Sequence, residues 1–280
     1  MLRKKLEDFS TAIATPAELR VLRKCPVCGL KPSATLIPVE KDSVFSSFEY
    51  YSVFYACAHF EKTQMLIAKH DNDIAALRRA NVLYDRCNLG ENFLEKTFES
   101  YDWRREPKAY EACIKYARGF EKYRKAGKGL LLVSSEYGNG KTHIAGAILH
   151  EVIKRHLATC IFVRGCDMVD DVQAAKWNRP VKFSVKTYEN CDLLVIDDLA
   201  KEGVTIGTAK AYWRIIDYRV LNRKPIVITT NYSETGLIEA VDDPAALDTW
   251  SAVIDRLAGM CNSVEFFGSS YRREVEAKVA

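Results

Sequence analysis

A short glycine-rich motif constrains this chain more than any other feature. Residues 138–142, Gly-Asn-Gly-Lys-Thr, follow an apolar stretch over 130–133 and precede a segment with helical spacing. A glycine-rich turn between a strand and a helix points backbone N–H groups inward, and the helix dipole adds positive charge, so the turn binds phosphate. The full pattern has a glycine where this chain has Ser135, which can make the turn, with strain if its φ is positive.

This motif provides a set of candidate contacts to ATP. We expect the charge of Lys141 to meet the β- and γ-phosphates and the Thr142 hydroxyl to ligate Mg²⁺. The alternative is a glycine-rich turn that holds no nucleotide. The predicted nucleotide contacts are Ser135, Gly138, Asn139, Gly140, Lys141, Thr142 and His143.

Polar residues follow two further apolar stretches. Asp197 and Asp198 come after residues 193–196, so both carboxylates should emerge at the carboxyl edge of a sheet, where open α/β sheets bind ligands. We expect Asp197 to hold Mg²⁺ through its waters and Asp198 to orient or deprotonate the attacking water. Asn231 follows another strand, where its amide can bond that water or the γ-phosphate. An acidic turn and an ordinary turn asparagine are the alternatives.

The pattern around these motifs predicts the fold class. From about residue 106, short apolar strands alternate with helical segments, which indicates an α/β fold with a parallel sheet covered by helices. We expect a small N-terminal module over residues 1–62, a helical connector over 63–105 and the α/β domain over 106–280. The predicted strands are 130–133, 160–163, 193–196, 226–228 and 264–267, and the predicted helices run from Pro107 to near Gly127 and over 141–156, 166–176 and 208–221.

Clustered cysteines distinguish the N-terminal module. Cys25 and Cys28 form a closely spaced thiol pair, and Cys57 and His59 would share one face of a strand. Together these four residues predict a structural zinc site. A redox pair and unrelated cysteines are the alternatives. His70 or Cys87 could replace His59 as the fourth ligand.

Composition limits the partners and the compartment. The net charge of +4 permits a nucleic acid but does not require one, so DNA binding must rest on a local patch. No apolar run suits a signal peptide or a membrane span, and we expect a cytoplasmic protein without membrane contact. One candidate patch for single-stranded DNA lies at residues 176–186, with an exposed loop whose aromatic rings are buried as an equal alternative. It consists of Lys176, Trp177, Arg179, Lys182, Phe183 and Lys186.

The order of these motifs resembles that of the DnaC/DnaI-type, IstB-like AAA+ ATPases, the replicative helicase loaders of bacteria and phages. The resemblance implies a RecA-like P-loop core that hydrolyses ATP to load a hexameric replicative helicase onto single-stranded DNA during DNA replication. It also implies that Asn231 is the sensor-1 residue and that Arg256 is an arginine finger acting on a second copy, hence self-association. The alternative for Arg256 is a helix-surface arginine that pairs with Asp255 or another neighbour. The matching stretches are 97–101, 138–143, 193–199, 215–219, 228–231 and 254–257.

Other functions share this ATPase core. An IstB-like helper of DNA transposition is the first alternative, and the Cys25 and Cys28 pair argues against it, because DnaI-type loaders carry a zinc module that contacts the helicase. A non-hydrolysing, nucleotide-gated adaptor is the second. A small-molecule kinase is the third, although it would leave Asn231 and Arg256 without a role. Residues 270–273 resemble the terminal Ser-Tyr-Arg of the family, and we expect the helical lid of many AAA+ proteins to be missing.

Overall fold

The computed structural model describes residues 33–37, 50–54, 75–76, 79–90, 93, 95–201 and 203–271. The chain divides into two units, Met1–Val82 and Leu83–Ala280. In the first unit, strands β1 (Ser33–Ile37) and β2 (Tyr50–Phe54) pair in antiparallel fashion. The predicted zinc ligands Cys25, Cys28, Cys57 and His59 lie outside the described residues, so the zinc site stays a prediction, as do the predicted domain limits.

A parallel sheet forms the centre of the second unit, in the strand order β4-β5-β6-β3-β7. Each pair of neighbouring strands in this sheet is parallel, so the carboxyl ends of these strands lie along one edge. The predicted parallel α/β fold is therefore confirmed. The strands are β3 (Gly129–Val133), β4 (Cys160–Arg164), β5 (Leu193–Asp197), β6 (Ile226–Thr230) and β7 (Cys261–Glu265).

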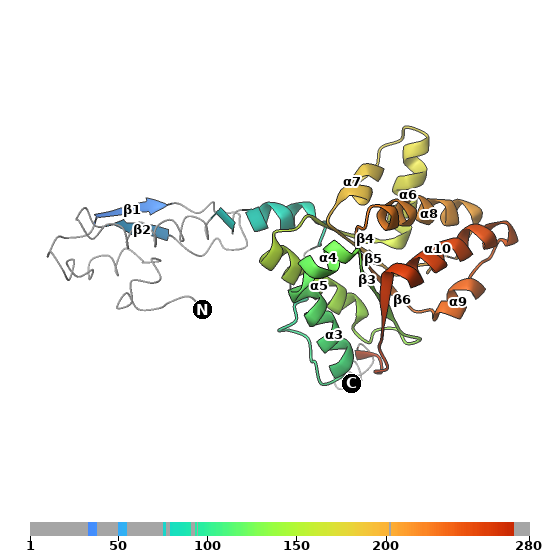
Figure 1. Cartoon of the computed structure of the whole chain (residues 1–280), viewed down its shortest axis with the longest axis horizontal. Helices are drawn as coiled ribbons and strands as arrows, with labels where there is room; N and C mark the ends of the chain where they lie inside the picture. The colour runs from blue at the N-terminus through green and yellow to red at the C-terminus, as the bar shows by residue number, and fades with distance from the viewer. Residues whose placement is uncertain are drawn as a thin grey trace, which may run out of the picture. The chain divides into compact units, whose positions relative to one another are not determined.

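Helices cover both faces of this sheet (Figure 1). Helix α5 (Lys141–His156) packs on β4, β5 and β6 and also contacts α3 (Pro107–Arg118) and α4 (Phe120–Ala126). The other layer holds α6 (Gly165–Lys176), α8 (Ile206–Leu221) and α10 (Leu247–Met260), with α8 in contact with both other helices. Shorter elements connect them: α7 (Val185–Asn190), α9 (Glu234–Glu239) and the 3-10 turn η2 (Pro244–Ala246).

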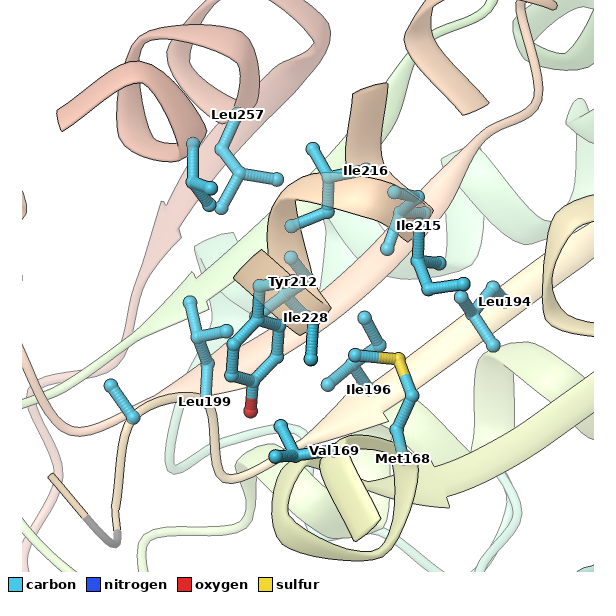
Figure 2. Packing of buried hydrophobic residues seen from close by; sticks show 14 of the residues in the cluster. Met168, Val169, Leu194, Ile196, Leu199, Tyr212, Ile215, Ile216, Ile228 and Leu257 are labelled. Atoms are coloured by element: carbon cyan, nitrogen blue, oxygen red, sulfur yellow. The ribbon is translucent and has the colours of Figure 1, made fainter. Parts of the chain in front are cut away.

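Figure 2 shows the core between the sheet and the second helical layer. Leu194 and Ile196 of β5 point toward this layer because successive side chains of a strand alternate between the two faces. They pack with Ile228 of β6, Ile215 of α8 and Leu257 of α10, and all five side chains are buried. This shared core fixes α8 against α10.

Two predicted elements differ from the structure by more than one or two residues at an end. The last strand is Cys261–Glu265 instead of 264–267. It lies at the edge of the sheet, and Val264 is its one buried side chain. Its first three residues therefore lack the apolar run by which the other strands were predicted. The predicted helix from Pro107 breaks at Gly119 into α3 and α4. Among the described residues, no helix is both long enough and apolar enough for a membrane span.

Candidate nucleotide-binding site

The loop that joins β3 to α5 has the backbone of a phosphate cradle. Gly138 and Gly140 have φ angles of 77° and 99°, a region that favours glycine because it has no Cβ. Ser135 does not have a positive φ, so it makes the turn without the backbone strain that a positive φ would cause. Lys141 is the first residue of α5, which places the helix N-terminus directly behind the loop.

Lys141 is buried and is held by neutral oxygen acceptors. Its Nζ donates to the carbonyl of Glu136 at 2.9 Å and to Oδ1 of Asn139 at 3.1 Å. Burial lowers the pKa of Lys141 to about 8, against the opposing effects of Asp198 and Asp197. An ammonium group bonded to neutral acceptors gains an ionic partner when a phosphate arrives.

Asp197 accepts hydrogen bonds from two threonine hydroxyls on different elements. Thr142 Oγ1 donates to Asp197 Oδ1 at 2.9 Å, and Thr229 Oγ1 donates to the same oxygen at 2.6 Å. The carboxylate is buried, and this burial raises its pKa, while the threonine bonds lower it. Carboxylate and hydroxyl oxygens side by side are the ligands that Mg²⁺ prefers.

Asp198 is fixed by a strained backbone and an ion pair. Its φ is +59°, its N–H donates to Thr229 Oγ1 at 2.9 Å, and its Oδ2 accepts from Lys201 Nζ at 2.8 Å. Thr229 therefore positions both acids. Neither Thr229 nor Lys201 is among the site residues predicted from the sequence. Two consecutive threonines in an otherwise apolar strand were the available signal, because fully buried hydroxyls need partners.

Asn231 directly follows β6, which lies between β5 and β3 in the sheet. The strand order thus puts Asn231 at the same edge as Asp197 and the loop that precedes Lys141. The structure brings together the predicted residues Lys141, Thr142, Asp197, Asp198 and Asn231 at one edge of the sheet.

His143 contacts a preceding segment of the chain. Its Nε2 lies 3.0 Å from the carbonyl oxygen of Thr97 and 3.2 Å from Oγ of Ser100, and its ring packs edge-on against Tyr101 at 5.3 Å between centroids. Burial lowers the pKa of His143. The Tyr101 ring also lies on Gly140, where an added Cβ would come within 2.6 Å of it. Residues 97–101 therefore cover one side of the loop.

The segment after β7 returns to the same loop. The N–H of Tyr271 donates to the carbonyl of Gly138 at 2.9 Å, and the Arg105 guanidinium lies 5.2 Å from the centre of the Tyr271 ring. These contacts place the start of the Ser-Tyr-Arg stretch beside the phosphate cradle. Arg272 and Arg273 lie outside the described residues.

Arg256 does not join this cluster. It lies in α10, whose end leads directly into the amino end of β7, whereas the phosphate loop leaves the carboxyl end of β3. A five-residue strand is about 16 Å long. Arg256 instead pairs with Asp217 of α8, at 2.7 Å between Nε and Oδ1.

The predicted DNA patch is only partly exposed. Its four cations are exposed, and Trp177 has 75% of its surface accessible. Phe183 is half-buried and packs edge-on against Tyr188, and its N–H donates to the buried carboxylate of Asp171. Trp177 is therefore exposed, as a DNA-binding patch requires, whereas Phe183 is packed against the protein, as the alternative expects.

The part of the chain that the structure describes has no group of three or more His, Cys, Asp or Glu side chains placed to hold a metal. Cys87, an alternative zinc ligand, is buried and donates its thiol to the carbonyl of Tyr84 at 3.0 Å. Burial raises its pKa to about 11, which disfavours the thiolate that zinc binds. His70 lies outside the described residues.

Comparisons with known proteins agree with this geometry. The sequence profile of the family described as IstB-like ATP binding protein matches residues 56–279. A Mycobacterium tuberculosis protein named for ATP binding in an insertion sequence is 25% identical over 209 residues, covering 75% of this chain and 80% of that protein.

Two solved structures share the fold of the second unit. The DnaC helicase loader matches with a TM-score of 0.54 at 24% identity, covering 64% of this chain and 100% of its own. DnaI matches with a TM-score of 0.57 at 19% identity, covering 64% and 95%. The family resemblance expected from the order of motifs is confirmed.

Proposed function

The chain belongs to the family of IstB-like ATP binding proteins, and from this premise we propose that it hydrolyses ATP to load a hexameric replicative helicase onto single-stranded DNA. One observation carries the proposal. Lys141, Thr142 and Asp197 meet at the carboxyl edge of a sheet whose fold the DnaC helicase loader and DnaI share.

The residues present fit a magnesium–ATP complex. Lys141 replaces its neutral acceptors with phosphate oxygens, and the backbone N–H groups around Gly138 and Gly140 bind the rest of the phosphate chain. Thr142 and Asp197 would hold Mg²⁺, and a dication there would offset the cost of the buried carboxylate. When bound, Mg²⁺ neutralises charge on the β- and γ-phosphates.

Hydrolysis then needs a base and an orienting group. Asp198 takes a proton from water as the water oxygen bonds to the γ-phosphorus, and the bond from that phosphorus to the bridging oxygen breaks to leave ADP and phosphate. Asn231 orients this water from the neighbouring strand tip. Because Asp198 is bonded to Lys201 in this structure, the Lys201 ammonium must share or release the carboxylate before the water can bond to it.

Three features support a helicase loader. The match to the DnaC and DnaI structures covers nearly the whole of each. The exposed Trp177 and the cations around it suit a single strand of DNA, with phosphates on the cations and a base on the indole. The sequence places Cys25, Cys28, Cys57 and His59 in the N-terminal module over residues 1–62, and a zinc site built from them would provide the kind of module that contacts the helicase in DnaI-type loaders.

A second candidate is an ATP-dependent helper of DNA transposition. The similarity to the Mycobacterium tuberculosis insertion-sequence protein favours it, because the match covers most of both chains. The Cys25 and Cys28 pair favours the helicase loader. The two candidates use the same ATPase site, so they differ in the partner alone.

Two linked measurements test the proposal. The full chain is used to capture partners from native lysate with and without ATP, and mass spectrometry identifies them. ATP turnover is then measured with single-stranded DNA, and loading of the captured helicase onto circular single-stranded DNA is followed. We expect ATP-dependent loading that is lost in Lys141→Ala and kept in Lys154→Ala, since Lys154 is an exposed lysine on the same helix.

Each unfavourable result removes a defined part of the proposal. Capture of a transposase, with no effect on helicase loading, would reject the helicase-loader function in favour of the transposition helper. Absence of turnover, together with an Asp198→Asn variant that binds its partner like the wild type, replaces the ATPase with a nucleotide-gated adaptor.

A further inference from the structure

The side chain of Arg256 is held by three contacts across α8 and α10. Its Nε donates to Asp217 Oδ1 at 2.7 Å, and its Nη1 donates to the carbonyl of Ala252 at 3.2 Å. Its guanidinium lies 3.7 Å from the centre of the Trp213 ring, a cation–π contact. Asp217 and Trp213 lie one turn apart on α8, so both reach the same partner on α10.

These contacts leave one end of the guanidinium available. They engage Nε and Nη1, and Nη2 has no hydrogen bond to the described residues. The side chain is 29% exposed, so it is neither free in solvent nor enclosed. A guanidinium presents its N–H groups in a rigid fork that suits phosphate, and fixing one side of this fork orients the other.

The location of Arg256 excludes a role for this residue in the chain's own nucleotide site. Asp217 is in the last turns of α8, which precede the amino end of β6, and Arg256 is in the last turns of α10, which precede the amino end of β7. The phosphate loop and Asp197 lie at the carboxyl ends of their strands. If Arg256 contacts a nucleotide, that nucleotide must therefore be bound to another molecule.

We propose that Asp217 is a positioning residue that, with Trp213, holds Arg256 oriented toward the nucleotide bound by a second copy of the chain. This inference rests on the proposed ATPase function and adds to it the group that orients the arginine. A long arginine side chain loses conformational freedom when it meets a phosphate, and a side chain oriented beforehand loses less. The competing account is that the ion pair only joins α8 to α10.

Mixtures of variants separate these two accounts. Lys141→Ala removes the nucleotide site but keeps Arg256, and Arg256→Ala keeps the site but lacks the arginine. We expect each to be inactive alone and the mixture to regain ATP turnover. The Asp217→Asn variant is then mixed with each at the same total protein concentration. It supplies working sites to the first mixture and arginines to the second.

The expected result is asymmetric. Asp217→Asn should turn over ATP normally when mixed with Lys141→Ala, because Lys141→Ala donates intact arginines. ATP turnover should be about tenfold lower when Asp217→Asn is mixed with Arg256→Ala, because Asp217→Asn must then donate its own arginine. Asp217→Glu should recover part of the lost turnover. Asp255→Asn is the matched control: this exposed carboxylate adjoins Arg256 in sequence and forms no ion pair among the described residues. It should behave like the wild type.

Three results would overturn the inference. Equal loss in both mixtures, together with a lowered melting temperature, identifies the pair as a structural link between α8 and α10. Full turnover by Arg256→Ala alone removes the trans-acting arginine and the role of Asp217 with it, while ATP hydrolysis stands. A wild-type protein without turnover overturns both this inference and the proposed ATPase, so the two failures are distinguishable.

Discussion

The hydroxyl of Thr142 donates a hydrogen bond at 2.9 Å to the carboxylate of Asp197, which stands 55 positions later in the chain. The first residue belongs to the helix that follows the phosphate loop, and the second ends the strand β5. Their contact shows that the loop and the acidic strand tip form one site. Because Asp197 is buried and its hydrogen-bond donors here are neutral hydroxyls, the site has negative charge ready for a cation.

The first prediction concerns this buried charge. Asp197→Asn keeps the size and one oxygen acceptor but removes the charge. Since burial raises the pKa of Asp197, its ionisation opposes folding as pH rises above the ordinary carboxyl value. At pH 7 the variant without nucleotide should therefore melt at the same temperature as the wild type or higher.

Magnesium–ATP should bind this variant at least about tenfold more weakly, because a hydrogen bond or contact to a charged group contributes about 1.5–3 kcal/mol. Thermal unfolding gives the melting temperature, and calorimetric titration with and without Mg²⁺ gives the affinity for ATP. A variant that melts lower and binds magnesium–ATP normally would contradict the assignment of Asp197.

The second prediction concerns the shape of the phosphate loop. Gly140 has a φ of 99°, and a Cβ there would lie 2.6 Å from the buried ring of Tyr101. Gly140→Ala should cost about 1–3 kcal/mol for the backbone alone, and more for the displaced ring. Urea unfolding gives this cost, and nucleotide titration should show weaker ATP binding.

Gly259→Ala is the matched control for this change. Gly259 lies in α10, and a Cβ there meets nothing within 4 Å. Alanine in a helix is favoured over glycine by about 0.5–1 kcal/mol, so this variant should be as stable as the wild type or more so. If Gly140→Ala is as stable as Gly259→Ala, neither the positive φ of Gly140 nor the packing of Tyr101 on it constrains the loop.

The third prediction is a pH dependence set by Lys141. Burial lowers the pKa of this lysine to about 8, and a bound triphosphate should raise it again. ATP binding should therefore take up a proton above pH 8, and affinity should fall by at most about tenfold per pH unit there. The unfolded chain binds more protons than the folded one between about pH 8 and 10.4, so this group's contribution to stability rises with pH.

Calorimetry in buffers of different ionisation enthalpy measures the proton uptake. Lys141→Arg is the comparison, because arginine keeps its charge throughout this range and should bind without proton uptake. The same uptake in both proteins would assign the titration to another group.

The sequence identified the parts of this site that depend on local pattern. A glycine-rich loop after a strand, and two acids after another strand, are short-range features, and the parallel sheet brings them to one edge by its topology alone. Helix α5 matched its predicted range because apolar spacing continues unbroken over 141–156.

The missing parts depend on tertiary contacts. Thr229 looks like any strand residue until β6 is placed beside β5, where it bonds both Asp197 and Asp198. The partner of Arg256 is another example: its sequence neighbour Asp255 is exposed, and the ion pair forms with Asp217 on a different helix. Periodicity cannot predict which helices pack together.

The fourth prediction concerns Arg219, a fully buried arginine in α8. Its Nη1 donates to the carbonyl oxygens of Tyr188 and Cys191 at 2.7 and 3.0 Å, and its Nη2 donates to that of Pro225 at 2.7 Å. The guanidinium thus joins the turn before β5 to the turn before β6, the two strands that carry Asp197 and Thr229.

Arg219→Lys should destabilise the protein by about 3–5 kcal/mol, because one ammonium cannot span both turns and a charge stays buried with carbonyl oxygens left unpaired. Urea unfolding measures the loss. Arg214→Lys, an exposed position on the same helix whose ion pair with Glu189 is 3.8 Å long, should change stability by less than about 0.5 kcal/mol. If Arg219→Lys is equally mild, the carbonyl oxygens find other donors, and the two turns are held by the packing of β5 against β6 instead.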